Sequence, residues 1–223
     1  LKNCFKIYII FLCLPLFAKP LVKLGIDRFF HEGLHRCLEN KNVGLVINQT
    51  SVDQNLNKTL DLFLHYAKQK RPNTPAGKKL QIYPFTLSCI FSPEHGLDGS
   101  ANAWQKVKHS TLKNLKVYSL HSETRRPTKM MLEGLDCIVF DIQDIGSRSY
   151  TYITTLFYVM QEAAKYNIQV IVLDRPNPMN GLVVDGPMLE EKWRSFIGYI
   201  DIAYCHGMTI AELARYFNQE YKV

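Results

Sequence analysis

The chain reads CIVFDIQD over residues 137–144, an apolar run that ends in a cluster of polar side chains. A run of this kind, without polar alternation, is typical of a strand buried on both faces of a parallel sheet. Three other stretches have the same character: Val43–Ile47, Leu87–Phe91 and Val170–Leu173. We therefore predict four buried strands, the third of them over Cys137–Phe140.

Segments with helical periodicity separate these runs. Apolar residues recur every three or four positions along them, which favours amphipathic helices. Helices are predicted over four segments: 27–39, 55–70, 151–167 and 210–221. The last is opened by Thr209, with Glu212 completing a capping box. The alternating order predicts an α/β fold, Rossmann-like and doubly wound, with a mostly parallel sheet and helices on both faces.

Composition limits the classes of protein to consider. Of 223 residues, 47% are hydrophobic and 21% are charged. These ordinary globular values exclude a disordered chain, a collagen-like repeat and a coiled coil. The formal net charge is +7, but outside the stretch 68–79 the basic residues are scattered, so nucleic-acid binding is not favoured. No phosphate-binding GxxxxGK or GxGxxG motif occurs, and we expect no cofactor.

The first residues have the order of a secretory signal. Residues 1–18 carry two lysines, continue as an apolar run over 7–17 and end in the small residue Ala18. The run is too short to span a bilayer stably. We expect removal of this leader, export to the periplasm or cell envelope, and one domain over 19–223 with no membrane span. A retained membrane anchor is the alternative, because Leu16 is large for its position before the cleavage site.

Neither the cysteines nor one HExxH match predicts a metal site. The cysteines outside the leader form no CxxC pair: Cys37, Cys89, Cys137 and Cys205. Two of them, Cys89 and Cys137, lie inside apolar runs, where a small buried hydrophobe is the expected role. Residues 31–35 read HEGLH, but Gly33 weakens a helix and no third ligand follows at a familiar spacing.

Polar residues follow all four predicted strands. The strand ends read NQT (48–50), SPEHG (92–96), DIQD (141–144) and DRPNP (174–178). Because open α/β sheets bind ligands beyond the carboxyl ends of their strands, these segments are expected to converge on one crevice. The alternative is that they only form turns. The crevice would hold carboxylates, amides, a histidine and an arginine.

Longer blocks of the sequence resemble a known family. The blocks are GLVINQT (44–50), FSPEHGLDG (91–99), DIQDIGSRSYTYITTL (141–156), LDRPNPMNG (173–181), DGPML (185–189) and HGMTIAELA (206–214). They resemble the exo-β-N-acetylmuramidases of peptidoglycan recycling, long known as a domain of unknown function. Two features depart from that family: it has a further C-terminal domain that closes over the cleft, whereas this sequence stops at Val223, and Cys205 stands where arginine is usual.

The resemblance implies an exo-acting glycoside hydrolase that releases terminal N-acetylmuramic acid from peptidoglycan fragments. A truncated, non-catalytic protein that binds such sugars is the alternative. Glycosidases usually place two carboxyl groups around the scissile bond. Glu94 on its stiff turn is our predicted general acid, with His95 as a group that orients it or contacts the sugar. Asp144 or Asp141 is expected to support the oxocarbenium-like centre, and which of them faces the sugar stays open.

Other polar and aromatic side chains near the same strand ends are candidates for sugar binding. They are Asn48, Gln143, Arg148, Tyr150, Tyr152, Arg175, Asn177 and His206. Amides suit hydroxyl and acetamido groups, and tyrosine rings offer flat faces to a pyranose. The arginines suit the lactyl carboxylate of muramic acid, because a guanidinium grips a carboxylate with two parallel donors. An internal ion pair with Asp141 or Asp174 is the alternative for them.

Overall fold

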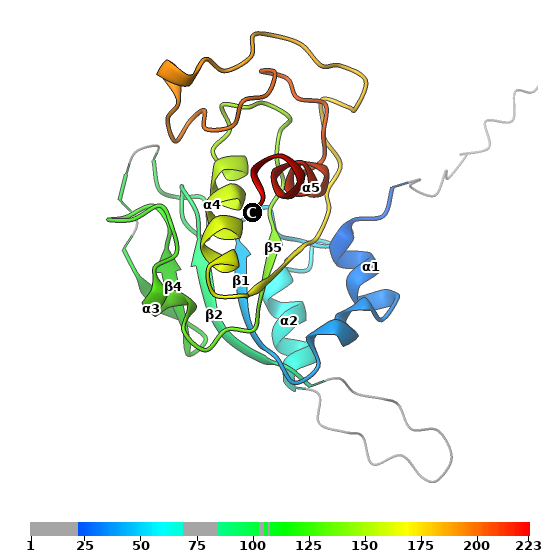
Figure 1. Cartoon of the computed structure of the whole chain (residues 1–223). Helices are drawn as coiled ribbons and strands as arrows, with labels where there is room; N and C mark the ends of the chain where they lie inside the picture. Colours follow the sequence, from blue (N-terminus) through cyan, green and yellow to red (C-terminus); the bar gives the residue numbers. More distant parts are fainter. Residues whose placement is uncertain (1–21, 69–83, 103–104, 107) are drawn as a thin grey trace, which may run out of the picture.

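The computed structural model describes residues 22–68, 84–102, 105–106 and 108–223 (Figure 1). The predicted leader at 1–18 and nearly all of the basic stretch at 68–79 lie outside the described residues. Six strands form one sheet: β1 Asn42–Ile47, β2 Thr86–Ser92, β3 Ser110–Leu112, β4 Leu115–Ser119, β5 Cys137–Asp141 and β6 Gln169–Val172. All four predicted strands are therefore present, each within one residue or so of its expected bounds.

The order of strands across the sheet is β3-β4-β2-β1-β5-β6. Neighbours pair in parallel, except for β3, which is antiparallel to β4. From β1 the chain builds outward to β2 and β4 on one side, then returns to add β5 and β6 on the other. This is the doubly wound order, with its switch point between β1 and β5, and it confirms the predicted Rossmann-like α/β fold.

Helices cover both faces of the sheet (Figure 1). The α-helices are α1 Gly25–His31, α2 Thr59–Lys68, α3 Lys129–Leu132, α4 Tyr152–Ala164 and α5 Ile210–Tyr221, and short 3₁₀ turns lie at Leu34–Leu38 and Glu191–Trp193. Among the described residues, none of these helices has the length and apolar character needed to cross a membrane.

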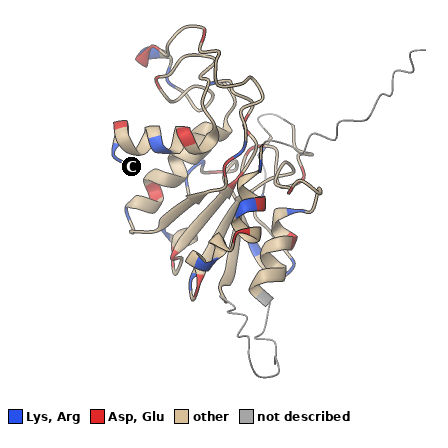
Figure 2. Cartoon of the chain, turned by 90° about the vertical axis from the view of Figure 1, so that its right-hand side faces the viewer, with Lys and Arg blue, Asp and Glu red and all other residues tan. Residues whose placement is uncertain are grey.

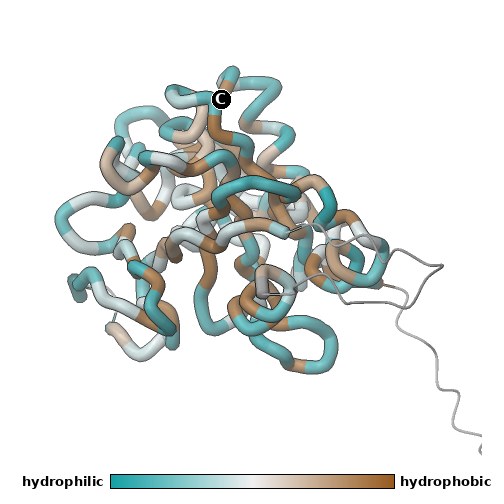
Figure 3. The backbone as a smooth tube through the Cα atoms, turned by 90° about the horizontal axis from the view of Figure 1, so that it is seen from below, coloured by the Kyte–Doolittle hydropathy of each residue, from teal (hydrophilic) through white to brown (hydrophobic). Residues whose placement is uncertain are grey.

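Alternation along the strands divides the core into two layers. Val46 of β1 and Phe140 of β5 pack with α3, α4 and α5, whereas Leu45 and Val139, one position earlier on each strand, pack with α1 and α2. Successive side chains of a strand point to opposite faces, so both faces of each central strand are buried. Figure 2 shows the strands mostly free of charged residues, and Figure 3 shows hydrophobic positions gathered toward the middle of the molecule. This burial explains why the predicted strands lack polar alternation.

Two predicted helices differ from the structure. The helix expected over 27–39 ends at His31, because Gly33 adopts a left-handed conformation with φ +74° and a 3₁₀ turn follows. The helix expected over 55–70 starts only at Thr59. The carboxylate of Asp53 accepts hydrogen bonds from the backbone N–H groups of Asn55 and Asn57, which folds the preceding residues into a turn.

The pair of strands β3 and β4 was not predicted. Their residues are mostly exposed or half-buried, and polar side chains alternate with apolar ones along β4. Neither strand therefore contains the continuous apolar run by which the four central strands were predicted.

The cysteines of the described chain are unpaired thiols. Cys89 and Cys137 are buried in the two strands that flank β1, and burial raises the pKa of each thiol to about 12. Both thiols are therefore protonated at neutral pH. They serve as the small buried hydrophobes that the apolar runs indicated.

Helix α5 begins at the predicted capping box. Thr209 Oγ1 accepts from the Glu212 N–H at 3.3 Å, and Glu212 Oε2 accepts from the Thr209 N–H at 2.8 Å. Loss of such a cap costs about 1 kcal/mol. Thr209→Ala is therefore expected to lower the melting temperature by about 2–4 °C in a thermal melt. Thr209→Ser, which keeps the hydroxyl, is the control, and equal melting of Thr209→Ala and the wild type would contradict the assignment.

Candidate active site

The carboxyl ends of the parallel strands meet at one edge of the sheet, where the polar segments NQT, SPEHG, DIQD and DRPNP follow β1, β2, β5 and β6. The switch point between β1 and β5 lies at this edge, which is where open α/β sheets bind ligands. Several polar side chains there are buried: Asn48, Ser92, Glu94, His121, Asp141, Asp144 and His206. A buried group of this kind needs partners, either within the protein or on a ligand.

Many of these side chains have polar atoms without a protein partner. In the described part of the chain, eight buried side-chain atoms lack a hydrogen bond, and six of them lie around this edge: Asn48 Nδ2, Ser92 Oγ, His121 Nδ1, Asp144 Oδ1, Tyr152 Oη and His206 Nε2. A buried donor or acceptor left without a partner costs about 1–3 kcal/mol. Such a concentration indicates a site built for a ligand rich in hydroxyl or amide groups.

Glu94 is held between two other elements. It follows β2 on a turn in which His95 and Gly96 both have positive φ, and its side chain is buried. One carboxyl oxygen, Oε2, accepts a hydrogen bond from the hydroxyl of Thr151 at 2.8 Å. The other, Oε1, lies 3.4 Å from Nε2 of His121. Each carboxyl oxygen of Glu94 therefore has a polar neighbour in the protein, which fixes the position of the carboxyl group.

His95 braces the loop that follows Glu94. Its Nδ1 lies 2.9 Å from the carbonyl oxygen of Ala101, and because a carbonyl only accepts, Nδ1 carries the proton. The ring thus closes the loop on itself. A direct role of His95 in the chemistry stays a prediction, and the hydrogen bond gives it a part in holding the turn on which Glu94 lies.

Only one of the two carboxyl oxygens of Asp144 has polar partners in the protein. Its Oδ2 accepts from the N–H of Gly146 at 2.7 Å and lies 3.2 Å from Nε2 of His206. The ring N–H is not aligned with this oxygen, so Nε2 remains among the unpartnered atoms. Nδ1 of the same ring accepts from the Met208 N–H, which assigns the proton to Nε2. Asp144 Oδ1 is buried and has no hydrogen-bond partner in the protein.

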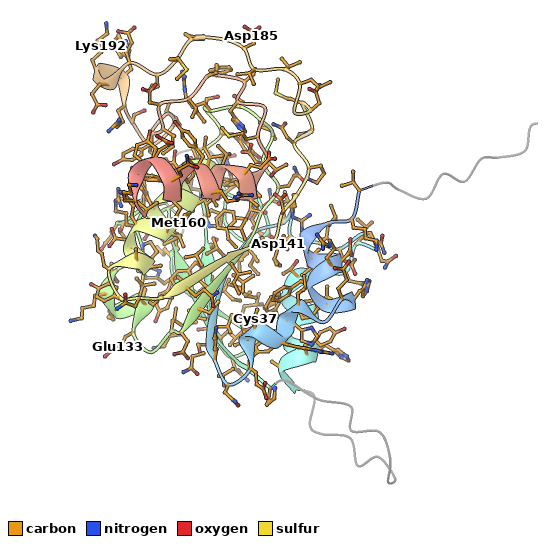
Figure 4. The ribbon with its side chains drawn as sticks, turned by 45° about the vertical axis from the view of Figure 1, so that its right-hand side comes forward. Cys37, Glu133, Asp141, Met160, Asp185 and Lys192 are labelled. Carbon is orange, nitrogen blue, oxygen red and sulfur yellow. The ribbon has the colours of Figure 1, made fainter. Side chains whose placement is uncertain are left out.

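Asp141 differs from Asp144 in every contact. It is fully buried at the end of β5 and lies in the interior of the molecule (Figure 4). Arg175 donates to it twice, from Nε at 2.7 Å and from Nη2 at 3.0 Å, and the Thr59 hydroxyl donates as well. Burial raises the pKa of the Asp141 carboxyl, and the hydrogen bonds from Arg175 oppose that effect. These contacts argue against Asp141 as a catalytic group and assign it to bracing the crevice.

The two predicted carboxylate-binding arginines both donate to the protein itself. Arg175 is paired with Asp141, the alternative that the sequence left open, and also donates to the carbonyl oxygen of Val52. Arg148 is buried and donates from Nη1 to the carbonyl oxygens of Pro187 and Ile202. Both guanidinium groups therefore connect separate segments of the chain.

The predicted amide groups fall into two kinds. Gln143 Nε2 donates to the carbonyl oxygens of Asp144 and Pro176, and Asn177 Nδ2 donates to that of Met208. These two amides hold loops together. Asn48 accepts through Oδ1 from Thr50, and its side chain also interacts with the Tyr152 hydroxyl.

Tyr150 and Tyr152 lie at the start of α4, with ring centroids 4.7 Å apart in an edge-to-face arrangement. Tyr152 is buried, and burial raises its pKa to about 12, so its hydroxyl, which interacts with the side chains of Tyr150 and Asn48, stays protonated. Tyr150 is half-buried, and burial followed by the charge of Asp144 raises its pKa. Residues 150–152 therefore belong to the candidate site, because Thr151 contacts Glu94 and Tyr150 lies near Asp144.

Sequence reasoning missed two residues of this site, His121 and Thr151. His121 follows β4, so the rule that polar residues after strands line the crevice applies to it once that strand is recognised. Thr151 precedes α4, and its sequence position suggested only a helix start. Its contact with Glu94 depends on packing between segments 57 residues apart.

The HExxH match does not form a metal-binding helix. Helix α1 ends at His31, and His35 lies beyond Gly33 in the 3₁₀ turn, where its Nδ1 contacts the carbonyl oxygen of Phe29. Its ring packs against Phe30 and other aromatic rings. Over the described ranges, no three His, Cys, Asp or Glu side chains gather as metal ligands would.

Comparison with known proteins shows which family the chain belongs to. Residues 43–223 match the family described as exo-β-N-acetylmuramidase NamZ, N-terminal. The chain belongs to the NamZ family. A Bacillus subtilis (strain 168) protein named peptidoglycan β-N-acetylmuramidase NamZ is 38% identical over 207 residues, which are 92% of this chain and 46% of that protein. The resemblance inferred from the sequence blocks is confirmed.

Two solved structures of DUF1343 family proteins from Bacteroides fragilis NCTC 9343 share the fold. One is 40% identical with a TM-score of 0.74 and the other 31% identical with a TM-score of 0.68. Each alignment covers 89% of this chain, and 46% or 47% of the solved chain. The present chain thus spans about half the length of the NamZ-family relatives it matches.

Proposed function

We propose that this chain is an exo-acting glycosidase that releases terminal N-acetylmuramic acid from peptidoglycan fragments. The family match and the name of the Bacillus subtilis relative support the substrate class. The observation that carries the proposal is the fixed carboxyl of Glu94, held by Thr151 and beside His121. Cell-wall fragments as substrate also fit the export that the leader predicts.

In this mechanism Glu94 is the general acid and Asp144 the second carboxylate. Glu94 gives its proton to the oxygen of the leaving group as the bond from that oxygen to C1 of the muramic acid breaks. The electron pair of the bond leaves with the oxygen. Asp144, whose Oδ1 has no hydrogen-bond partner in the protein, stabilises the positive charge that develops at C1. Water then adds to C1, and the proton it loses restores the acid form of Glu94.

The hydroxyl-rich sugar would satisfy the unpartnered atoms of the crevice. Ser92 Oγ can donate or accept a hydrogen bond, and Asp144 Oδ1 is an acceptor. A site whose buried polar groups are paired only in the complex discriminates strongly against analogues that lack the matching groups. This arrangement favours a sugar ligand over an apolar one.

A second candidate is a protein that binds muramyl sugars without cleaving them. One observation favours it: both carboxyl oxygens of Glu94 already have polar neighbours in the protein, Thr151 at 2.8 Å and His121 at 3.4 Å. A binder would use the same donors and acceptors of the crevice, while Glu94 would contribute only hydrogen bonds.

Incubation of the purified chain with a chromogenic N-acetylmuramide distinguishes the two candidates. We expect release of the chromophore, and little release from the matching N-acetylglucosaminide, which lacks the lactyl ether. Calorimetric titration with N-acetylmuramic acid accompanies the assay. Binding without release would support the non-catalytic candidate, and the absence of both would refute the proposal.

A further inference from the structure

His121 is a buried histidine beside the predicted general acid. It lies just beyond β4, and its backbone N–H donates to Ser119 Oγ at 3.1 Å. The ring lies 5.9 Å, centroid to centroid, from that of Phe196. Nε2 faces Glu94 Oε1 at 3.4 Å. Its burial between a strand end and an aromatic ring fixes the imidazole against Glu94.

The two carboxyl oxygens of Glu94 have different neighbours. The Thr151 hydroxyl donates to Oε2, so that oxygen acts as an acceptor. The other oxygen, Oε1, lies beside His121. The distance of 3.4 Å is long for a hydrogen bond, as is common for catalytic contacts before substrate binds.

Three charged or titratable groups act electrostatically on His121: Glu94 and His95 from the loop after β2, and Arg125 from the segment after β4. Burial lowers the pKa of His121, the charge of Glu94 opposes that effect, and Arg125 and His95 lower the pKa further. The imidazole is therefore neutral at neutral pH. A neutral ring can donate or accept at Nε2 without placing a second charge against the substrate.

We propose that His121 is a positioning residue that holds Oε1 of Glu94 in place for proton transfer to the substrate. The inference rests on the proposed role of Glu94 as general acid. It adds a residue that fixes the orientation of that carboxyl.

Two substitutions test the role in catalysis. His121→Leu removes the ring nitrogens, and we expect kcat to fall by about tenfold to a hundredfold with KM within about twofold. His121→Gln places an amide near the position of Nε2, so it should recover much of kcat. Both variants should shift the pH profile of kcat relative to the wild type. A thermal melt of each variant controls for folding, and wild-type kcat and pH profile in folded His121→Leu would overturn the proposal.

A second measurement is independent of hydrolysis. NMR titration of the His121 ring in the wild type and in Glu94→Gln measures their coupling directly. Because the charge of Glu94 raises the pKa of His121, its removal is expected to lower the titration midpoint of the ring. An unchanged midpoint would overturn the pairing whether or not the chain is active. A lowered midpoint in a chain without hydrolysis would instead refute the proposed function alone.

Discussion

Replacement of Glu94 by Gln is expected to lower hydrolysis of a chromogenic muramide by about 10² to 10⁴-fold, the usual contribution of a general acid. The amide cannot deliver the proton that the leaving oxygen requires. It can keep both contacts of the carboxyl, because its oxygen can accept from Thr151 while its NH₂ group faces His121. The thermal melt and the affinity for N-acetylmuramic acid should therefore change little.

Glu191→Gln is the matched control. Glu191 lies in an exposed 3₁₀ turn and pairs with Arg194 on the surface, so the same chemical change there should leave kcat, melting and binding unaltered. Near wild-type turnover of Glu94→Gln would show that another group donates the proton. A large loss of melting temperature would show instead that Glu94 is chiefly structural.

Asp141→Ala is expected to destabilise the fold by about 3–5 kcal/mol, because it leaves the buried Arg175 guanidinium without its counter-charge. For a domain of this size the melting temperature should fall by roughly 6–20 °C. Asp144→Asn, by contrast, should lower hydrolysis while leaving the melt nearly intact. Thermal unfolding and the muramide assay, run on both variants, separate the two roles.

An exposed ion pair supplies the control for Asp141. Asp61 pairs with Lys113 at the surface, and Asp61→Asn should cost less than about 1 kcal/mol. A double variant, Asp141→Leu with Arg175→Met, should recover part of the lost stability because it removes both buried charges. If Asp141→Ala melted like the wild type and lost hydrolysis as Glu94→Gln does, Asp141 would be the group that faces the sugar.

The central strands were predictable because burial on both faces leaves them without polar alternation. Strand β4, with Lys116 and Tyr118 half-buried or exposed, gave no such signal and was missed. The capping box at Thr209 is a local pattern, and the sequence located it correctly. Gly33 was recognised as unfavourable to a helix, but only the structure shows that its left-handed conformation ends the helix before it.

In the candidate site, Glu94 and Asp144 could be predicted because the carboxyl ends of parallel strands meet at one edge of the sheet. The separate roles of Asp141 and Asp144 could not be predicted from the sequence. Asp141 and Arg175 are 34 residues apart, and their pairing depends on the neighbouring positions of β5 and β6 in the sheet. His121 remained hidden for the same reason, since its relevance depends on β4 lying next to β2.

The sheet order also bears on how such a protein can diversify. Glu94 follows β2 and Asp144 follows β5, and each of these strands neighbours β1. The loops that carry the two carboxylates thus leave the sheet two strand spacings apart, about 9–10 Å. Backbone hydrogen bonds set that separation, independently of the surrounding side chains. Loop residues that select a sugar can therefore be substituted while the two loops that carry Glu94 and Asp144 keep the same spacing on the sheet.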